Sequence, residues 1–171
     1  MRHYGNLHIE SGDRRDFSSL KEIRGDLSIA RDAIFSTPSL IACKNIFLGE
    51  GSSLTAQGLL YCIHVHAYES STFTAARVPC IGHVHLYEDA SIDFPNLMRF
   101  GSLRIRAGSR FSLPQLHTVE ILSLEDSCHA TLPGLLHCTS IFLGKNSVLS
   151  ASKYLGFQHL SRERGSSILD I

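Results

Sequence analysis

A period of nineteen residues constrains this chain more than any other feature of its sequence. An apolar side chain recurs at this interval through six positions: Leu40, Leu59, Val78, Leu97, Leu116 and Leu135. The same step links a second series: Ile46, Val65, Val84, Leu103, Leu122 and Ile141. A third series follows two residues after the second: Leu48, Ala67, Leu86, Ile105, Leu124 and Leu143. A fixed period of this kind indicates a repeat protein, in which each repeat buries its apolar side against its neighbours.

Within each repeat, apolar and polar residues alternate, as they do from Ile46 to Leu48 and from Ser52 to Leu54. Alternation is typical of strands, whose successive side chains point to opposite faces. Glycine and small polar residues between these segments indicate tight corners and leave no room for a helix. We therefore predict an all-β fold: a single-domain parallel β-solenoid of about eight 19-residue coils with polar end caps, and rungs ~4.8 Å apart.

The nineteen-residue repeat divides the chain into three parts. Residues 1–19 are expected to form an N-terminal capping coil, because Asp13 and Arg15 occupy positions that are apolar in other repeats. Residues 20–153 are expected to form the regular coils, with one extra residue near Gly25. Residues 154–171 are expected to form a C-terminal cap and tail, in which Tyr154, Phe157 and Leu160 begin a ninth coil before the chain becomes polar at Ser161. Polar terminal repeats keep a solenoid soluble.

The segment from Phe17 to Leu40, FSSLKEIRGDLSIARDAIFSTPSL, resembles the leucine-rich-like β-solenoid repeats of bacterial and phage proteins. The resemblance extends along most of the chain as a periodicity, although the other repeats lack the Gly-Asp before the strand. It implies a fold and no single activity. The chain is also similar, less closely, to bactofilins, the filament-forming β-helices, whose coils are richer in Gly and Val; that likeness implies self-assembly.

Charge and hydropathy exclude several classes of protein. Sixteen basic and sixteen acidic residues give no net charge, which argues against a nucleic-acid-binding protein. The first thirty residues hold no apolar run typical of a signal peptide. No stretch approaches the roughly 18–20 apolar residues of a membrane span. We expect a cytoplasmic protein, or one delivered to a host cell without a cleaved signal peptide, and no membrane partner.

Five cysteines occur in apolar surroundings, and no Cys-x-x-Cys pair is present. This pattern favours small core residues over a zinc or redox motif. Cys43 and Cys62 are nineteen residues apart and so belong to neighbouring coils. In a reducing compartment we expect such thiols to stay free and buried.

Two successive repeats carry a His-Val-His motif, in CIHVHAYE at 62–69 and in IGHVHLYE at 81–88. The inward phase of Val65 and Val84 directs the flanking side chains outward: His64, His66, Tyr68, His83, His85 and Tyr87. The next repeat adds Arg104 and Arg106 to the same outer columns. Neighbours in a column are expected about 5 Å apart. Phe47 and Phe142 are predicted to point outward in the column of His66.

These outward residues support three interpretations. The first is a partner-binding face with Phe47 and Phe142 as outer anchors, since Tyr, His and Arg are common in recognition surfaces. A metal site is the second interpretation, in which His64, His66, His83 and His85 act with Glu69 or Glu88. The third is a solvated sheet face whose residues reflect strand propensity. We favour the first, with a protein partner and no cofactor.

No catalytic signature is present in the sequence: no P-loop, no GxSxG, no HExxH and no GxGxxG. Repeats of equal length leave no long loops from which a catalytic cleft could be built. The sequence therefore predicts a non-enzymatic protein-binding module, similar to an effector or inhibitor in a bacterial or phage setting. A self-assembling structural β-helix and a metal-binding protein or metal-dependent enzyme that uses the paired histidines remain alternatives. A homodimer through the Phe47 and Phe142 face also stays open.

Overall fold

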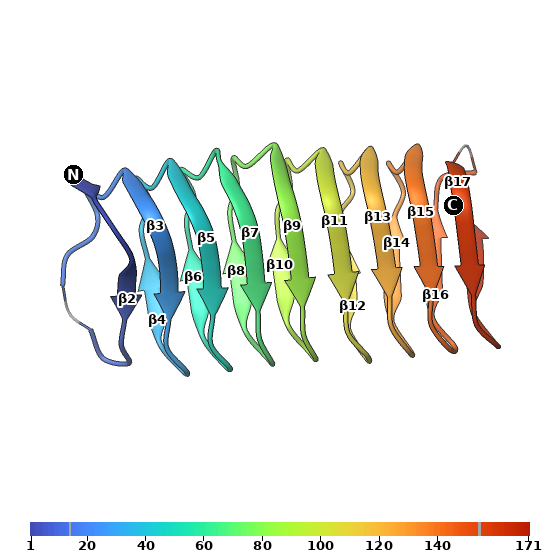
Figure 1. Cartoon of the computed structure of the whole chain (residues 1–171), viewed down its shortest axis with the longest axis horizontal. Coiled ribbons are helices and arrows are strands. Elements are labelled where there is room, and N and C mark those ends of the chain that lie inside the picture. Colours follow the sequence, from blue (N-terminus) through green and yellow to red (C-terminus); the bar gives the residue numbers. More distant parts are fainter. Residues whose placement is uncertain (14, 154) are drawn as a thin grey trace.

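The nineteen-residue period folds into a stack of flattened coils that runs from one end of the molecule to the other (Figure 1). The structure is a computed structural model that describes residues 1–13, 15–153 and 155–171. In the described residues the regular elements are strands and none is a helix. Every pairing between the described strands is parallel, which confirms the predicted parallel β-solenoid. The stack holds nine coils in this part of the chain.

One side of the solenoid is a single ten-stranded sheet. Each coil contributes its longer strand to this sheet, and the first coil contributes two short segments that both pair with β3. The strands are β1 (Arg2–His3), β2 (Leu7–Ile9), β3 (Glu22–Ile29), β5 (Ala42–Leu48), β7 (Cys62–Ala67), β9 (Cys80–Leu86), β11 (Arg99–Ile105), β13 (Thr118–Leu124), β15 (His137–Leu143) and β17 (Gly156–Arg162).

The opposite side is built from shorter strands and divides into two four-stranded sheets. The first holds β4 (Ile34–Ser36), β6 (Ser53–Thr55), β8 (Thr72–Thr74) and β10 (Ser91–Asp93). The second holds β12 (Arg110–Ser112), β14 (His129–Leu132), β16 (Val148–Ala151) and β18 (Ser167–Asp170). The long sheet is therefore the only one that runs the whole length of the described solenoid.

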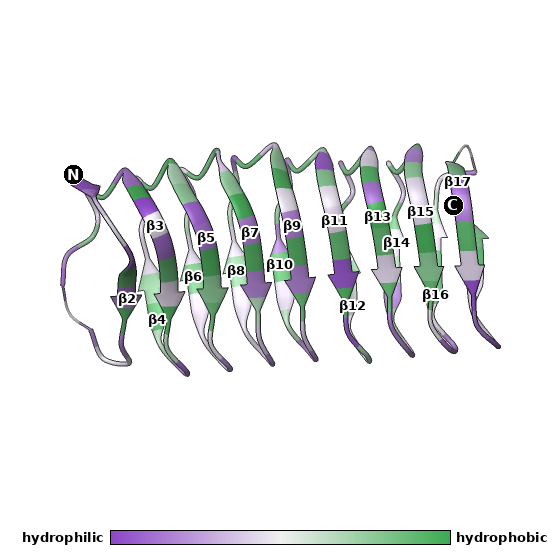
Figure 2. Ribbon diagram, viewed as in Figure 1, coloured by the Kyte–Doolittle hydropathy of each residue, from purple (hydrophilic) through white to green (hydrophobic). Residues whose placement is uncertain are grey.

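The register of the long sheet follows the predicted columns. Ile46 pairs with Val65, and Val65 pairs with Val84, as the nineteen-residue step requires. Each of these residues is buried. The alternation of inward and outward side chains is not strict in β7. Cys62 and Val65 both point inward, but two residues lie between them instead of one. Figure 2 shows the resulting bands of apolar and polar residues along the long strands. The extra residue predicted near Gly25 is confirmed by a register shift between Ile23 and Asp26.

The interior is a continuous apolar column between the two sides. The first predicted series is completely buried: Leu40, Leu59, Val78, Leu97, Leu116 and Leu135 are each 0% exposed. Burial of one leucine contributes about 2 kcal/mol relative to an exposed one. No coil encloses these side chains alone, so each coil depends on the two beside it.

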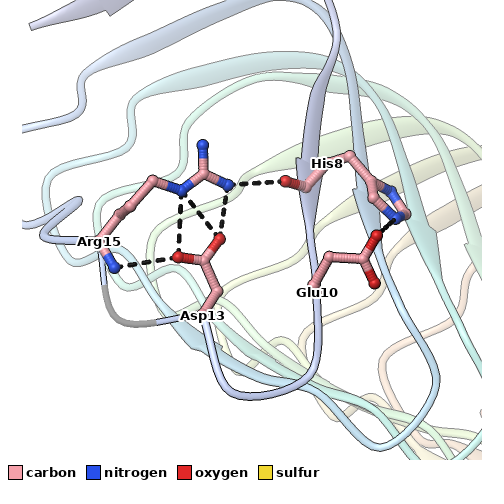
Figure 3. A network of polar contacts seen from close by, with 4 residues as sticks. All are labelled: His8, Glu10, Asp13 and Arg15. Atoms are coloured by element: carbon pink, nitrogen blue, oxygen red, sulfur yellow. Dashed lines mark hydrogen bonds and ion pairs between the residues drawn. The ribbon is translucent and has the colours of Figure 1, made fainter.

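The N-terminal end of the stack is closed by polar contacts around Arg15 (Figure 3). Its guanidinium donates to the carboxylate of Asp13 and to the backbone oxygen of His8, which lies in β2. The same group lies 5.0 Å from the centre of the Phe17 ring. Residues Leu7 and Ile9 of the first coil are consequently buried. Asp13 and Arg15, which break the apolar pattern in the sequence, form this cap.

The C-terminal end is different. Residues 154–171 were expected to begin a ninth coil and to end in a polar cap and tail, and β17 and β18 continue the register of β15 and β16 as a ninth coil. Tyr154 lies outside the described residues. Arg162 occupies the column of Leu143, but Phe157 and Leu160 stay 46% and 37% exposed. This end therefore presents an apolar surface and a strand edge with no partner in the described structure.

No helix that is long and apolar enough to cross a membrane exists in the described part of the chain.

Candidate functional site

The outer face of β7, β9 and β11 brings the predicted histidines, tyrosines and arginines together. The pairing sets His64 beside His83, His66 beside His85, and His85 beside Arg104. The tyrosines and Arg106 follow directly after the strands. We call this set the histidine strip: His64, His66, Tyr68, His83, His85, Tyr87, Arg104 and Arg106. In Figure 2 the strands that carry the strip, β7, β9 and β11, lie on the side toward the viewer, in the middle of the solenoid.

Rings in the strip stack on one another along the solenoid axis. The rings of His64 and His83 are 4.8 Å apart and nearly parallel, at 11°. Tyr68 and Tyr87 are 4.7 Å apart at 27°. In the middle column, His66 lies between Phe47, stacked at 5.1 Å and 20°, and His85, whose ring is 4.9 Å away and tilted by 57°. These separations match the spacing of neighbouring strands, so the backbone register sets the stacking.

The two arginines are each held by a neighbour. The Arg104 guanidinium donates two hydrogen bonds to one carboxylate oxygen of Glu125, at 3.1 and 2.9 Å. Arg106 lies with its guanidinium carbon 4.5 Å from the centre of the Tyr87 ring, a cation–π contact. Sequence reasoning missed Glu125, although the nineteen-residue step from Tyr68 through Tyr87 and Arg106 leads directly to it.

A polar pair continues the outer column of His64 toward the N-terminus. Asn45 pairs in register with His64, and its side-chain nitrogen donates to the Asp26 carboxylate at 2.7 Å. The side-chain oxygen of Asn45 is buried and has no hydrogen-bond partner in the described structure. A buried acceptor without a partner is costly, and a donor on the next rung would relieve that cost. The imidazole of His64 is the side chain on that rung.

The two phenylalanines have different surroundings. Phe47 belongs to the column of His66 as predicted, but its ring is half-buried because the imidazole covers one face. Phe142 is 45% exposed and lies two rungs beyond Arg104, with Ser123 between them. The small serine leaves an open hollow of about 460 Å³ between Arg104 and Phe142. Phe142 is thus an isolated exposed ring, whereas Phe47 is part of the stacked column.

Burial and neighbouring charge disfavour protonation of the strip. Partial burial lowers the pKa of His64, and His83 and Lys44 lower it further. Partial burial is also the main cause of the lowered pKa of His66. The pKa of His85 falls for the same reason, with added repulsion from His66 and Arg104. These three imidazoles are therefore mostly neutral at pH 7.

The distances between the histidine rings do not favour the alternative of a metal site. Among the described residues, no group of three or more His, Cys, Asp or Glu side chains is placed to hold a metal ion. Two nitrogens bound to one zinc ion lie at most about 4 Å apart, since each Zn–N bond is about 2.0–2.1 Å. Parallel rings 4.8 Å apart, as in His64 and His83, would have to tilt to meet this limit. Glu69 and Glu88 lie at the exposed corner beyond the tyrosines.

The chain matches no protein-family model, no curated protein and no solved structure. The fold assignment therefore rests on the repeat and on the strand pairing. The resemblances to leucine-rich-like solenoids and to bactofilins remain likenesses of repeat pattern.

Proposed function

We propose that this chain is a non-enzymatic protein-binding module, and that the histidine strip with Phe47 and Phe142 is its contact face. In the proposed setting, which is bacterial or phage, such a module acts as an effector or inhibitor of a host protein. It works in the cytoplasm, of its own cell or of a host cell. The repeat architecture favours binding, because a solenoid offers a rigid extended surface.

One observation carries the proposal: eight polar aromatic and cationic side chains are gathered on three adjacent coils of the one sheet that is continuous along the described solenoid. The stacked rings are held by their neighbours, so a partner would meet a surface that is already ordered. Pre-ordered side chains lose little conformational entropy on binding. Tyr and Arg are also the residues that dominate binding energy at protein interfaces.

The test is capture of a partner from a bacterial lysate with two matched variants. The first carries His66→Glu, His85→Glu and Arg104→Glu in the strip. The second carries Thr72→Glu, Ser91→Glu and Arg77→Glu, which lie away from the strip at exposed positions. Both variants change the same number of neutral and basic residues to glutamate, so net charge is matched. Circular dichroism checks that each variant keeps its strands.

We expect a protein that binds the wild type and the Thr72, Ser91 and Arg77 variant, and is lost with the strip variant. A protein lost equally with both variants would indicate a general charge effect and would contradict the proposal. A protein retained by both would locate binding elsewhere on the solenoid.

Self-assembly is the second candidate, because the C-terminal coil leaves Phe157 and Leu160 exposed beside an unpaired strand edge. Open strand edges promote pairing with another chain. The cap at Arg15 opposes head-to-tail growth, since it occupies a backbone oxygen of the first coil. This candidate is therefore a closed dimer formed through two C-terminal ends, in contrast to the filaments of bactofilins.

A further inference from the structure

We infer that the histidine strip recognises a carboxylate-rich extended segment of its partner, and that this binding tightens as the solution is acidified from neutrality. The inference rests on the proposed function and specifies the chemistry of the partner. Its support comes from the orientation of the rings, from the charges around them and from their spacing.

Contacts between neighbours occupy both ring faces at the centre of the strip. The face of His66 toward Phe47 and the face toward His85 are both occupied. Tyr87 likewise lies between Tyr68 and the guanidinium of Arg106. A nucleobase or sugar would need a free ring face on which to stack. Ring edges instead offer N–H and O–H donors, which suit the oxygens of a carboxylate.

The charges of the strip are of one sign. Strands β7, β9 and β11 contain no Asp or Glu. Lys44 lies on the preceding coil, and Arg104 lies on the following one. The carboxylates near the strip are Glu69 and Glu88 at the corner, Glu125, which is hydrogen-bonded to Arg104, and Asp26, which accepts from Asn45 two rungs from His64. Protonated imidazoles would therefore have no carboxylate of this chain on an adjacent rung of their own columns, which favours an anionic partner.

The spacing fits an extended segment that lies along the strands. His64 and His66 are two residues apart in β7, as are His83 and His85 in β9. Outward side chains at this separation are about 6.5–7 Å apart. Alternate side chains of an extended partner have the same spacing. A segment with an acidic residue at every second position would thus set successive carboxylates over successive imidazoles.

Proton linkage gives the direction of the pH effect. The free strip resists protonation, because burial and repulsion lower the pKa of His64, His66 and His85. A carboxylate placed opposite an imidazole favours the charged form and raises its pKa. The complex then binds more protons than the free protein, so affinity rises as pH falls. Each proton taken up tightens binding by about tenfold per pH unit in the range where it titrates.

The experiment uses a fluorescent, end-blocked peptide of alternating Glu and Ser residues, and the same peptide with Gln in place of Glu. Binding to the full chain is measured by anisotropy at pH 7.5 and at pH 5.5, where glutamate is still ionised. We expect the Kd of the Glu peptide to fall by at least about tenfold on acidification, and the Gln peptide to bind weakly at both values. The double variant His66→Gln, His85→Gln should show a clearly smaller pH effect, because only two of the four imidazoles of the strip remain.

The matched control is the double variant His129→Gln, His137→Gln, which removes two exposed histidines outside the strip. It should keep the wild-type pH effect. Equal binding of the two peptides, or binding of the Glu peptide that does not tighten at pH 5.5, would overturn the inference. Neither result bears on the lysate capture, which tests the proposed function with a real partner. A strip-dependent partner whose affinity does not rise on acidification would likewise overturn the inference and leave the proposed function intact.

Discussion

Among single residues, the histidines of the strip are notable because their rings lie only one strand spacing apart, so protonated rings would repel one another. His66 illustrates this, because it is enclosed by Phe47 and by His85 and has no carboxylate within its column. The register of the sheet keeps the backbones of these neighbours one strand spacing apart, so the rings stay near one another when they gain charge. The folded state therefore binds protons less readily than the unfolded chain near pH 6.

We predict that the protein loses stability on mild acidification. The pKa of His64, His66 and His85 lies below the unfolded value of 6.5, mainly because burial disfavours the charged form. The neutral histidines contribute fully to the free energy of unfolding above pH 6.5, and this contribution is lost as the pH falls through their pKa values in the folded protein. Thermal unfolding at pH 7.5 and 5.5 should show a lower Tm at pH 5.5. His66→Gln with His85→Gln should reduce this difference, and His129→Gln should not.

The cysteines give a second prediction at this scale. Cys43, Cys62, Cys128 and Cys138 are buried, whereas Cys80 is exposed, so the expectation of a buried thiol is wrong for one of the five. Burial raises the pKa of Cys43 to about 12 and that of Cys138 to about 11. The thiolate is the reactive form. Ellman's reagent should therefore titrate one thiol in the native protein and five in guanidinium, and Cys80→Ser should abolish the native reaction. More than one fast native thiol would contradict the burial of the others.

Among the elements, the corner that follows each long strand contains a residue with positive φ. The position recurs with the repeat, and its occupants include Asp32, Gly51, Ser70, Asp89, Gly108, Ser127, Asn146 and Gly165. Gly, Asn, Asp and Ser are the residues that tolerate or stabilise such turns. Because this left-handed residue recurs at the same place in successive coils, the corners have the same backbone conformation and the coils can stack in register.

Gly108→Ala should destabilise the protein by about 1 kcal/mol through the backbone alone. Gly108 has φ of 81°, and a Cβ built on it meets nothing within 4 Å. Gly156→Ala is the matched control, because a Cβ there meets its nearest atom at an ordinary 3.6 Å and the φ of Gly156 is not positive. It should change the free energy of unfolding by less than about 0.5 kcal/mol. Urea denaturation measures both, and equal effects would disprove the explanation by φ.

At the scale of the whole molecule, the two ends of the solenoid are unlike. The first coil is covered by Arg15, Asp13 and the hydrogen bond to the His8 oxygen. The ninth coil exposes Phe157 and Leu160. A contact between two identical ends closes on itself by two-fold symmetry, whereas a head-to-tail contact propagates. The structure therefore favours a dimer over a filament, if this chain assembles with itself.

Light scattering after size exclusion tests that expectation. We predict a mass that rises with concentration toward twice the 18.9 kDa of one chain, and no larger species. Leu160→Asp should restore the monomer, because a charge on the strand edge opposes pairing. Ile34→Asp is the control, since Ile34 is 82% exposed on the other side of the solenoid. A strict monomer at high concentration, or equal loss of the dimer with Ile34→Asp, would exclude the C-terminal end as the interface.

Much of the site could be predicted from the repeat. The outward direction of His64, His66, His83 and His85 and their pairing across coils followed from counting nineteen residues. The half-buried state of Phe47 did not, because it depends on how the His66 ring is rotated. The contacts of Arg104 with Glu125 and of Arg106 with Tyr87 also depend on side-chain conformation. Long flexible side chains have several rotamers that no periodicity distinguishes.

The parallel solenoid, the inward columns and the membership of the outer ones could be read from the sequence, because strand alternation and a constant period leave one arrangement that buries the recurring apolar columns. The tertiary structure was needed to show that the polar end of the ninth coil stays paired and where the short side is interrupted. Residues Ser161 and Arg162 pair with β15, and Ser167–Asp170 pair with β16, although Arg162 and Asp170 break the apolar pattern. The division lies between β10 and β12, which belong to different sheets although the nineteen-residue step continues through both. Strand pairing depends on packing among many residues, so its interruption leaves no periodic signal in the sequence.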